Sequence, residues 1–364
     1  MYNKDIINKA LDYTRKVVSN KIYELIDQKK TIDGAYQPLY DHLSDYPFRK
    51  GKGLRPTLCV SVARGVGGMG HSALVSSAAL ELYHNAFLIH DDVEDGSENR
   101  RGKETLHQLL GIPRAVNIGD ATNVLAVSML LENLDEIGVA RTLQIIYEIE
   151  QMARQSVEGQ SMELDWVANQ RFDLGDEDYF RMCTKKTCWY TFITPCRIGY
   201  IVGSSFWNDT DIKERLEQLT NFGMYLGIGF QIQDDLLNLV GSEKKYGKEI
   251  GGDIYEGKRT IMLNHLIKHA GANRDKIVEI IKKPRSSKSK KDVDFVLHEM
   301  KVCGSIEYGQ ELALKMTKKA QELLHQMSFL KKKSSLQPGE QWNCAEVDFR
   351  FINEIVNYVI ERDL

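Results

Sequence analysis

Two clusters of aspartates, about 140 residues apart, are the residues of this chain best suited to chemistry. The first contains Asp91, Asp92 and Asp95, and the second contains Asp234 and Asp235. Each cluster ends a segment whose apolar pattern predicts a buried helix, where a carboxylate is costly unless a cation or hydrogen bonds satisfy it. Mg²⁺ takes oxygen ligands and is usually held by one or two carboxylates together with phosphate oxygens. The two clusters therefore predict a site where Mg²⁺ ions hold a diphosphate.

The spacing within the clusters supports this interpretation. Asp91 and Asp95 are four residues apart, so they share one face of a helix and repel each other unless a cation lies between them. Asn238 has the same spacing from Asp234 and offers an amide oxygen in place of a further carboxylate. For one such cluster alone, a solvated helix end with surface acids is an equally good interpretation. The second cluster favours the metal site.

Basic residues on glycine-flanked turns accompany the aspartates. Lys52 and Arg55 lie in the run Gly51-Lys52-Gly53-Leu54-Arg55-Pro56, a turn that opens a predicted helix and can offer cations and N–H groups to phosphate. The other candidates follow the two clusters or begin a further helix: Arg100, Arg101, Lys186, Thr187, Lys248 and Lys258. His84 lies two turns before Asp91, where an isolated histidine would ordinarily be a core residue.

The elements that must position these residues are helices. Apolar residues recur at helical spacing over residues 72–90, 115–134, 143–166, 177–203 and 212–240. Convincing alternating strand patterns are missing, so the predicted fold class is all-α, a single-domain bundle whose central helices are buried on most faces. Residues 65–70 predict a glycine-rich turn, and the polar segments 284–291 and 331–346 predict solvated surface loops.

The composition excludes several classes of protein. A net charge of −3 over 364 residues gives no reason to expect nucleic-acid binding. The first residues are polar, and no uncharged apolar run reaches the length of a membrane span, so neither a signal peptide nor a transmembrane helix is expected. None of the six cysteines forms a C-x-x-C pair, which makes a structural zinc site improbable and suggests core thiols in a reducing cytoplasm.

Together, these motifs resemble those of the trans-isoprenyl diphosphate synthases, or polyprenyl synthetases. The matching elements stand in the family's order from about residue 50 to the C-terminus: Gly51-Lys52-Gly53-Leu54-Arg55-Pro56, Glu81-Leu82-Tyr83-His84, His90-Asp91-Asp92 with Asp95, Arg100-Arg101-Gly102, Lys186-Thr187, Phe230-Gln231-Ile232-Gln233-Asp234-Asp235, Gly247-Lys248, Gly257-Lys258 and Gly304-Ser305-Ile306. The chain departs from the family in lacking a doubled glycine before Lys52, and in having Asn238 where a third aspartate is common.

The resemblance implies a synthase domain over residues 36–364, preceded by an N-terminal helical extension over residues 1–35, and a central apolar cavity. It also implies a homodimer and about three Mg²⁺ ions per active site. The metal ligands would be Asp91, Asp92, Asp95, Asp234 and Asp235. The allylic diphosphate would be bound by Arg100, Lys186 and Lys258, with Lys248 near it, and Thr187 and Gln231 would lie beside the developing carbocation. Isopentenyl diphosphate would be bound by Lys52, Arg55, His84 and Arg101.

Product length is expected to depend on the helix that ends in Asp91. In the resembling family, bulky residues four and five positions before this aspartate form a floor under the growing chain; here they are Phe87 and Ala86, with Tyr83 a turn further back. One aromatic in place of two predicts a twenty-carbon product, geranylgeranyl diphosphate, with farnesyl diphosphate as the alternative. A core-packing role for both rings remains open. A terpene cyclase is disfavoured by the isopentenyl diphosphate residues, and a regulatory subunit by the intact first cluster.

Overall fold

The computed structural model describes residues 2–49, 51–205, 210–241, 250–330 and 338–361, and this part of the chain is almost entirely helical. The long helices are α1 (Lys4–Lys30), α4 (Leu54–Gly65), α5 (Leu74–Glu94), α7 (Ile112–Leu131), α9 (Val139–Ala168), α11 (Thr194–Gly203), α12 (Ile212–Val240), α17 (Lys290–Val302), α18 (Ser305–Gln326) and α19 (Phe349–Glu361). The short helices are α2 (Gln37–Leu43), α3 (Asp45–Phe48), α6 (Leu106–Leu110), α8 (Asn133–Ile137), α10 (Asp176–Cys183), α14 (Gly252–Glu256), α15 (Ile261–His269) and α16 (Arg274–Lys282). The all-α class is thereby confirmed.

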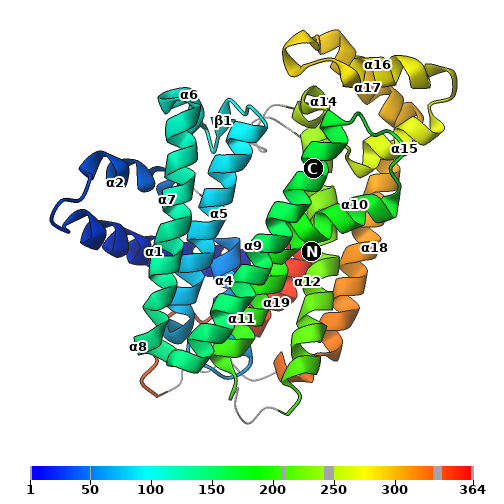
Figure 1. The fold of residues 1–364 in the computed structure, drawn as a ribbon. Helices are drawn as coiled ribbons and strands as arrows, with labels where there is room; N and C mark the ends of the chain where they lie inside the picture. Colours follow the sequence, from blue (N-terminus) through cyan, green and yellow to red (C-terminus); the bar gives the residue numbers. More distant parts are fainter. Residues whose placement is uncertain (1, 50, 206–209, 242–249, 331–337, 362–364) are drawn as a thin grey trace.

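In the bundle, α5 packs mainly against α7, α4 and α1, with α11 also touching it, whereas α12 packs mainly against α18 (Figure 1). Residues 75–82 of α5 are all buried, so this helix is surrounded on every side, as its apolar sequence predicts. The helices α14 to α17 form a lobe at one end of the bundle, and α1 and α2 lie at its flank. The aspartates of both clusters fall near the end of the bundle that carries this lobe.

The predicted helix over residues 177–203 is interrupted. The chain forms α10, then ten residues of π-helix called η2 (Thr184–Ile193), then α11. η2 packs so tightly against α9 that a Cβ on Gly159 would lie 2.2 Å from the backbone nitrogen of Lys186. π-Helical turns are rare and frequently occur at functional sites, and this one carries Lys186 and Thr187.

The only strands among the described residues are the two-residue pair β1 (Asn99–Arg100) and β2 (Lys103–Glu104), which form an antiparallel hairpin directly after α5. No strand was expected from the sequence. The hairpin presents Arg100 and Arg101, two of the predicted substrate-binding residues.

Both predictions of solvated loops are wrong in part. Lys288, in the segment 284–291, is only 7% exposed, and its ammonium donates to the carbonyl of Tyr255 at 2.7 Å. In the segment 331–346, Trp342 and Cys344 are buried, and the fully buried carboxylate of Glu340 pairs with Arg64 at 3.1 Å. In both segments, described residues are held by partners distant in sequence, and residues 331–337 lie outside the described residues. The glycine-rich turn over residues 65–70 is present between α4 and the short turn η1 (His71–Ala73).

The ends of the described chain lie together. The backbone nitrogen of Tyr2 donates to the carboxylate of Glu361 at 3.0 Å, and α1 buries eight of its residues against the bundle. The separate extension over residues 1–35 stays a prediction. Five of the six cysteines are buried and none is paired. Among the described helices, none is both long and apolar enough to cross a membrane.

Candidate active site

A cavity of about 1120 Å³ opens between α4, α5, α9, η2 and α12 and reaches the lobe at α14. Most of the residues predicted from the motifs line it: Lys52, Arg55, His84, Phe87, Asp91, Arg100, Arg101, Lys186, Thr187, Gln231, Asp234, Asp235 and Lys258. Of the other predicted residues, Asp92, Asp95, Tyr83 and Ala86 are described but are not part of its lining, and Lys248 lies outside the described residues. Residues scattered over more than 200 positions thus meet around one space.

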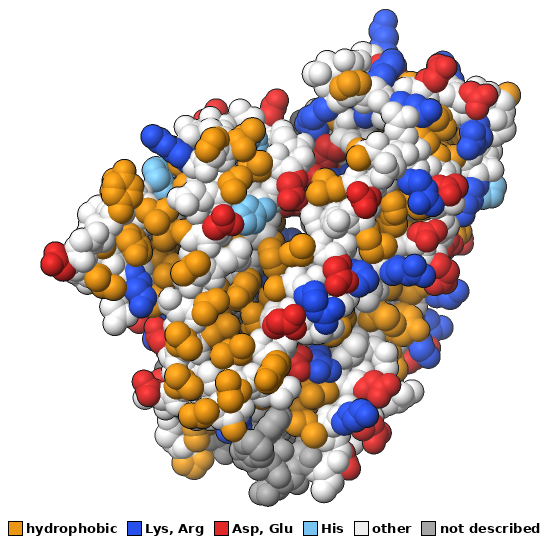
Figure 2. Space-filling view, viewed as in Figure 1, with side chains coloured by type: hydrophobic (Ala, Val, Ile, Leu, Met, Phe, Trp, Pro, Cys, Tyr) orange, Lys and Arg blue, Asp and Glu red, His pale blue; other side chains and the backbone are white. Residues whose placement is uncertain are grey.

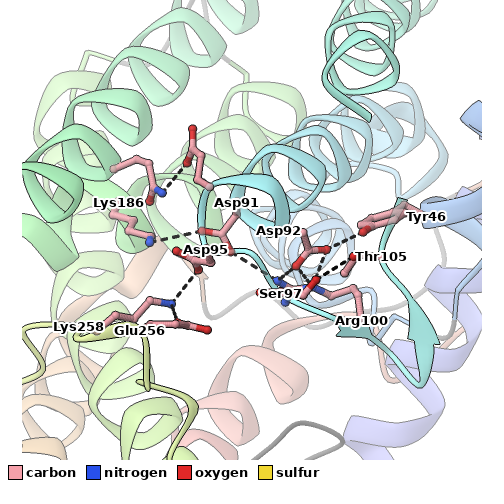
Figure 3. A network of polar contacts seen from close by, with 12 residues as sticks. Tyr46, Asp91, Asp92, Asp95, Ser97, Arg100, Thr105, Lys186, Glu256 and Lys258 are labelled. Carbon is pink, nitrogen blue, oxygen red and sulfur yellow. Dashed lines mark hydrogen bonds and ion pairs between the residues drawn. The ribbon is translucent and has the colours of Figure 1, made fainter. Parts of the chain in front are cut away.

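The three acids of the first cluster have different partners (Figure 3). Asp92 is fully buried; Tyr46 donates to its carboxylate at 2.5 Å, and the Nε of Arg100 donates to it at 2.9 Å. Asp91 lies 3.5 Å from Lys186 and also 3.5 Å from Arg100, and Asp95 pairs with Lys258 at 2.9 Å. Asp92 is therefore placed to hold Arg100, whereas Asp91 faces the cavity.

The two lysines opposite these acids are themselves held by further carboxylates. Lys186 forms a close ion pair with Glu163 of α9, and Lys258 pairs with Glu256 at 2.9 Å. Burial alone would lower the pKa of Lys186, but the carboxylates of Glu163 and Asp91 outweigh it and raise this pKa. Both ammonium groups are therefore charged, and both lysines line the cavity.

In the second cluster, Asp235 accepts hydrogen bonds from two neutral donors. Tyr179 donates to Asp235 at 2.7 Å, and the amide of Gln231 donates to the same carboxylate at 2.8 Å. Thr187 in turn donates to the Gln231 oxygen at 2.8 Å, so η2 and α12 are joined beside the cavity. Burial raises the pKa of Asp235 to about 7, although the hydrogen bonds from Tyr179 and Gln231 lower it. Within the part of the chain that the structure describes, no lysine or arginine pairs with this carboxylate, unlike those of the first cluster.

Asn238 serves the fold in this structure. Its side-chain oxygen accepts a hydrogen bond from the backbone nitrogen of Asp253 at 3.0 Å, and its own carbonyl accepts from Gly251 at 2.7 Å. It thereby fixes the start of α14, and Asp253 of α14 lines the cavity. The amide found in place of a third aspartate holds the neighbouring turn.

The donor set fits Mg²⁺. Asp91 and Asp234 line the cavity from two helices, and their oxygen atoms are the ligands that Mg²⁺ prefers. Within the described ranges, no three acidic, histidine or cysteine side chains are close enough to hold an ion by themselves. Mg²⁺ needs no such cage, because it commonly completes its shell with water and substrate phosphate. The site is one in which metal and diphosphate would bind together.

The residues predicted for isopentenyl diphosphate gather around Arg55. Its guanidinium donates to Thr191 at 2.8 Å and lies 4.6 Å from the centre of the Tyr190 ring, which stacks on His84 at 5.8 Å. Burial, and then the charge of Arg55, lowers the pKa of His84 well below its usual value, so the imidazole is neutral. Lys52 donates to Tyr358 of α19 at 3.0 Å.

Sequence reasoning missed several residues of this site. Glu163, Tyr190 and Tyr358 line the cavity and contact predicted residues, yet none belongs to a motif that was singled out. Glu163 could have been noticed, because it is an acidic residue on a helix that was predicted from its apolar pattern. No local signal marks Tyr358, which reaches Lys52 from 306 positions away.

Phe87 is the aromatic residue of the proposed floor that lines the cavity. Its ring lies 6.3 Å from that of Tyr83 and 5.7 Å from that of Tyr190. Ala86 is fully buried in the helix packing. Beyond Phe87, the lining continues to α7 and α9 through Asn123 and Val157.

Comparisons with known proteins agree with this geometry. Residues 37–300 match the family model of polyprenyl synthetase. A geranylgeranyl diphosphate synthase of Saccharolobus solfataricus is 34% identical over 281 residues, covering 76% of this chain and 80% of that protein. The crystal structure of a geranylgeranyl pyrophosphate synthetase from Pyrococcus horikoshii superposes with a TM-score of 0.80 at 28% identity, covering 99% of both chains.

A further structure shares the fold at 23% identity, with a TM-score of 0.79 and coverage of 97% of this chain and 99% of that one. It is a geranylgeranyl pyrophosphate synthase from Corynebacterium glutamicum, complexed with isoprenyl diphosphate and magnesium. The family match over residues 37–300 confirms the resemblance seen in the motifs: the chain belongs to the polyprenyl synthetase family.

Proposed function

We propose that this protein is a Mg²⁺-dependent trans-prenyltransferase that condenses isopentenyl diphosphate with an allylic diphosphate to make geranylgeranyl diphosphate. One observation carries the proposal: a single cavity of about 1120 Å³ is lined by acids of both clusters and by two separate sets of cations. Lys186 and Lys258 pair with acids of the first cluster. The other cations have different partners: Lys52 bonds to Tyr358, Arg55 to Thr191, and Arg101 to the carbonyls of Tyr46 and Arg49. Two diphosphates can therefore be bound at once, next to an apolar wall.

The chemistry follows from this division. Bound Mg²⁺ would neutralise and polarise the allylic diphosphate as a Lewis acid. Lys186 and Lys258 stabilise the charge that develops on the leaving pyrophosphate when the allylic C–O bond breaks. The oxygens of Thr187 and Gln231 lie beside the cavity, where they face the carbocation. Phe87 and the surrounding apolar wall exclude water that would otherwise trap the cation.

Bond formation then uses the second substrate. Lys52, Arg55 and Arg101 hold the diphosphate of isopentenyl diphosphate so that its double bond reaches the allylic carbon. The π electrons form the new C–C bond, and the proton lost from the adjacent carbon passes to the departing pyrophosphate. Neutral His84 can donate a hydrogen bond to the bound diphosphate without adding charge. No further co-reactant is required.

An exposed apolar surface supports the expected homodimer. Val124, Val127 and Leu131 of α7, and Val139, Leu143 and Tyr147 of α9, are each about half exposed or more. Figure 2 shows hydrophobic side chains gathered over this side of the molecule. Large apolar patches on soluble proteins mark interaction sites, and a second copy of the chain would cover this one. A cytoplasmic location is part of the same proposal.

The direct test is product analysis. Purified protein is incubated with isopentenyl diphosphate, Mg²⁺ and dimethylallyl, geranyl or farnesyl diphosphate in turn, and the dephosphorylated products are separated by length. We expect incorporation of isopentenyl diphosphate and a dominant twenty-carbon product, abolished by EDTA. A fifteen-carbon product would favour the farnesyl alternative. Hydrocarbon formed from the allylic substrate alone would indicate a cyclase and contradict the proposal.

A further inference from the structure

Arg101 has a backbone conformation that its residue type rarely adopts. Its φ is +53°, and Gln170 is the only other described non-glycine residue with positive φ. Residues with a Cβ atom seldom occupy this region, and they persist there only when their surroundings hold them. Arg101 is also one of the cations proposed for isopentenyl diphosphate. Strain at a substrate-binding residue raises the question of which contacts maintain it.

The contacts come from α3 and the residue after it. The guanidinium of Arg101 donates to the carbonyls of Tyr46 and Arg49, each at 3.3 Å. Arg49 donates in the opposite direction, to the carbonyl of Arg100 at 3.1 Å and to that of Glu104 at 2.7 Å. Arg49 is 3% exposed. The Arg49 guanidinium therefore donates to main-chain carbonyls on both sides of Arg101.

A second connection runs through side chains. The Arg49 guanidinium lies 4.4 Å from the centre of the Tyr46 ring, and the Tyr46 hydroxyl donates to Asp92 at 2.5 Å. Asp92 is the carboxylate that holds the side chain of Arg100. The same two residues thus fix the side chain of Arg100 and the backbone of Arg101. A two-residue hairpin could not fix them alone, because its own ladder contains so few hydrogen bonds.

We propose that Arg49 and Tyr46 are positioning residues that preset Arg100 and Arg101, and thereby couple the allylic and isopentenyl diphosphate subsites through one hairpin. The inference rests on the proposed function. Neither residue lines the cavity, so each acts through the hairpin arginines. Arg49 supports both arginines through the backbone, whereas the Tyr46 hydroxyl reaches only Arg100, through Asp92.

The test compares Arg49→Lys with the matched control Arg64→Lys. Both arginines are 3% exposed, and each has one acidic partner and at least one main-chain carbonyl partner. Arg64 bonds the carbonyl of Val347 and the carboxylate of Glu340, and none of these three residues lines the cavity. Lysine keeps the positive charge but lacks the planar guanidinium that donates to several carbonyls at once. We expect Arg49→Lys to raise the KM of both substrates about tenfold or more, as losing charge-assisted hydrogen bonds does, and Arg64→Lys to leave both KM values unchanged while lowering Tm.

A gentler variant separates the two connections. Tyr46→Phe removes one hydroxyl and keeps the ring under Arg49, so it should raise the KM of the allylic substrate more than that of isopentenyl diphosphate. Equilibrium binding of isopentenyl diphosphate to metal-free protein supplies a readout without turnover; Arg49→Lys should weaken it and Tyr46→Phe should not. Unchanged KM values in both variants, with only a lower Tm, would overturn the inference. An inactive wild-type protein would instead refute the proposed function.

Discussion

The two acidic clusters differ in what surrounds them. At the end of α5, Asp91 and Asp95 face lysines, and Asp92 is held by Arg100. On α12, Asp235 is held by a tyrosine hydroxyl and a glutamine amide. Nearby cations lower the pKa of a carboxylate, although burial still raises that of Asp95 to about 6 beside Lys258. At Asp235, whose described hydrogen-bond donors are neutral, burial raises the pKa to about 7. We therefore expect the first cluster to be the main electrostatic anchor of the site. The second cluster would complete the site when metal and diphosphate bind.

The largest expected effect follows from removing the anchor. Asp91→Asn keeps the shape of the side chain and removes the charge that faces both the cavity and Lys186. We expect kcat to fall about 10³-fold or more, the scale of losing a principal electrostatic group, and added Mg²⁺ not to restore it. Asp135→Asn, at an exposed position of α8, is the control and should keep full activity. Activity near that of the wild type at saturating Mg²⁺ would show that Asp91 does not hold metal.

A smaller effect is expected from Glu163→Gln. Without Glu163, the Lys186 ammonium should shift toward Asp91, 3.5 Å away, and compete with metal there. We expect kcat to fall about 10- to 100-fold, equivalent to losing one or two charge-assisted hydrogen bonds, and the Mg²⁺ concentration for half-maximal activity to rise. The matched control is Glu158→Gln, because Glu158 pairs with the neighbouring Lys185 on the exposed side of α9.

Equal losses in the Glu163 and Glu158 variants would mean that the pairing of Glu163 with Lys186 is structural. A lower kcat without a change in Mg²⁺ dependence would place the effect on diphosphate binding alone. Either result would weaken the view that Glu163 holds the Lys186 ammonium away from Asp91 and so leaves Asp91 able to bind Mg²⁺.

The first cluster also shows what sequence can predict. Asp91, Asp95 and Arg100 lie within ten residues, so helical spacing and motif order were enough to group them. Glu163 reaches Lys186 across 23 positions, and Arg49 reaches the hairpin across more than 50. No local pattern encodes such pairs, since only the packing of separate helices brings them together.

The buried polar segments were misjudged for the same reason. Glu340 was assigned to a solvated loop because its partner Arg64 lies 276 positions earlier in the sequence. The π-helix that carries Lys186 was likewise predicted as part of one regular helix, because no local pattern marks its close packing against Gly159 of α9 and Gly227 of α12. Helical class and motif order are local properties, whereas the supporting contacts are not.

The contrast between the clusters also predicts a pH dependence. Burial raises the pKa of Asp235 to about 7, above that of an unfolded aspartate near 3.9. The folded protein then binds a proton that the unfolded chain has lost, so this group costs stability increasingly as pH rises from about 4 to about 7. Asp235→Asn should therefore gain stability relative to the wild type over that range, on the order of a few kcal/mol at most. Denaturant unfolding of metal-free protein measures it, and a difference independent of pH would contradict the expectation.

The smallest expected effect on rate concerns the floor of the cavity, where the first cluster's own helix sets product length. Phe87 lines the cavity one turn before Asp91, and the Tyr83 ring lies behind it, 6.3 Å away. Phe87→Ala should therefore deepen the cavity by about one helical turn, roughly 5.4 Å, which is close to the length of one isoprene unit. Tyr83→Ala alone should change little, because Phe87 still closes the path, and it serves as the matched control.

The double variant should lengthen products by a further unit, since both rings are then absent. Chromatography of the dephosphorylated products from all three variants measures the shift. An unchanged product distribution in the double variant would place the floor elsewhere. The cavity lining continues to Asn123 of α7 and Val157 of α9. Because Val157 is 62% exposed, a second copy of the chain could then close the cavity there.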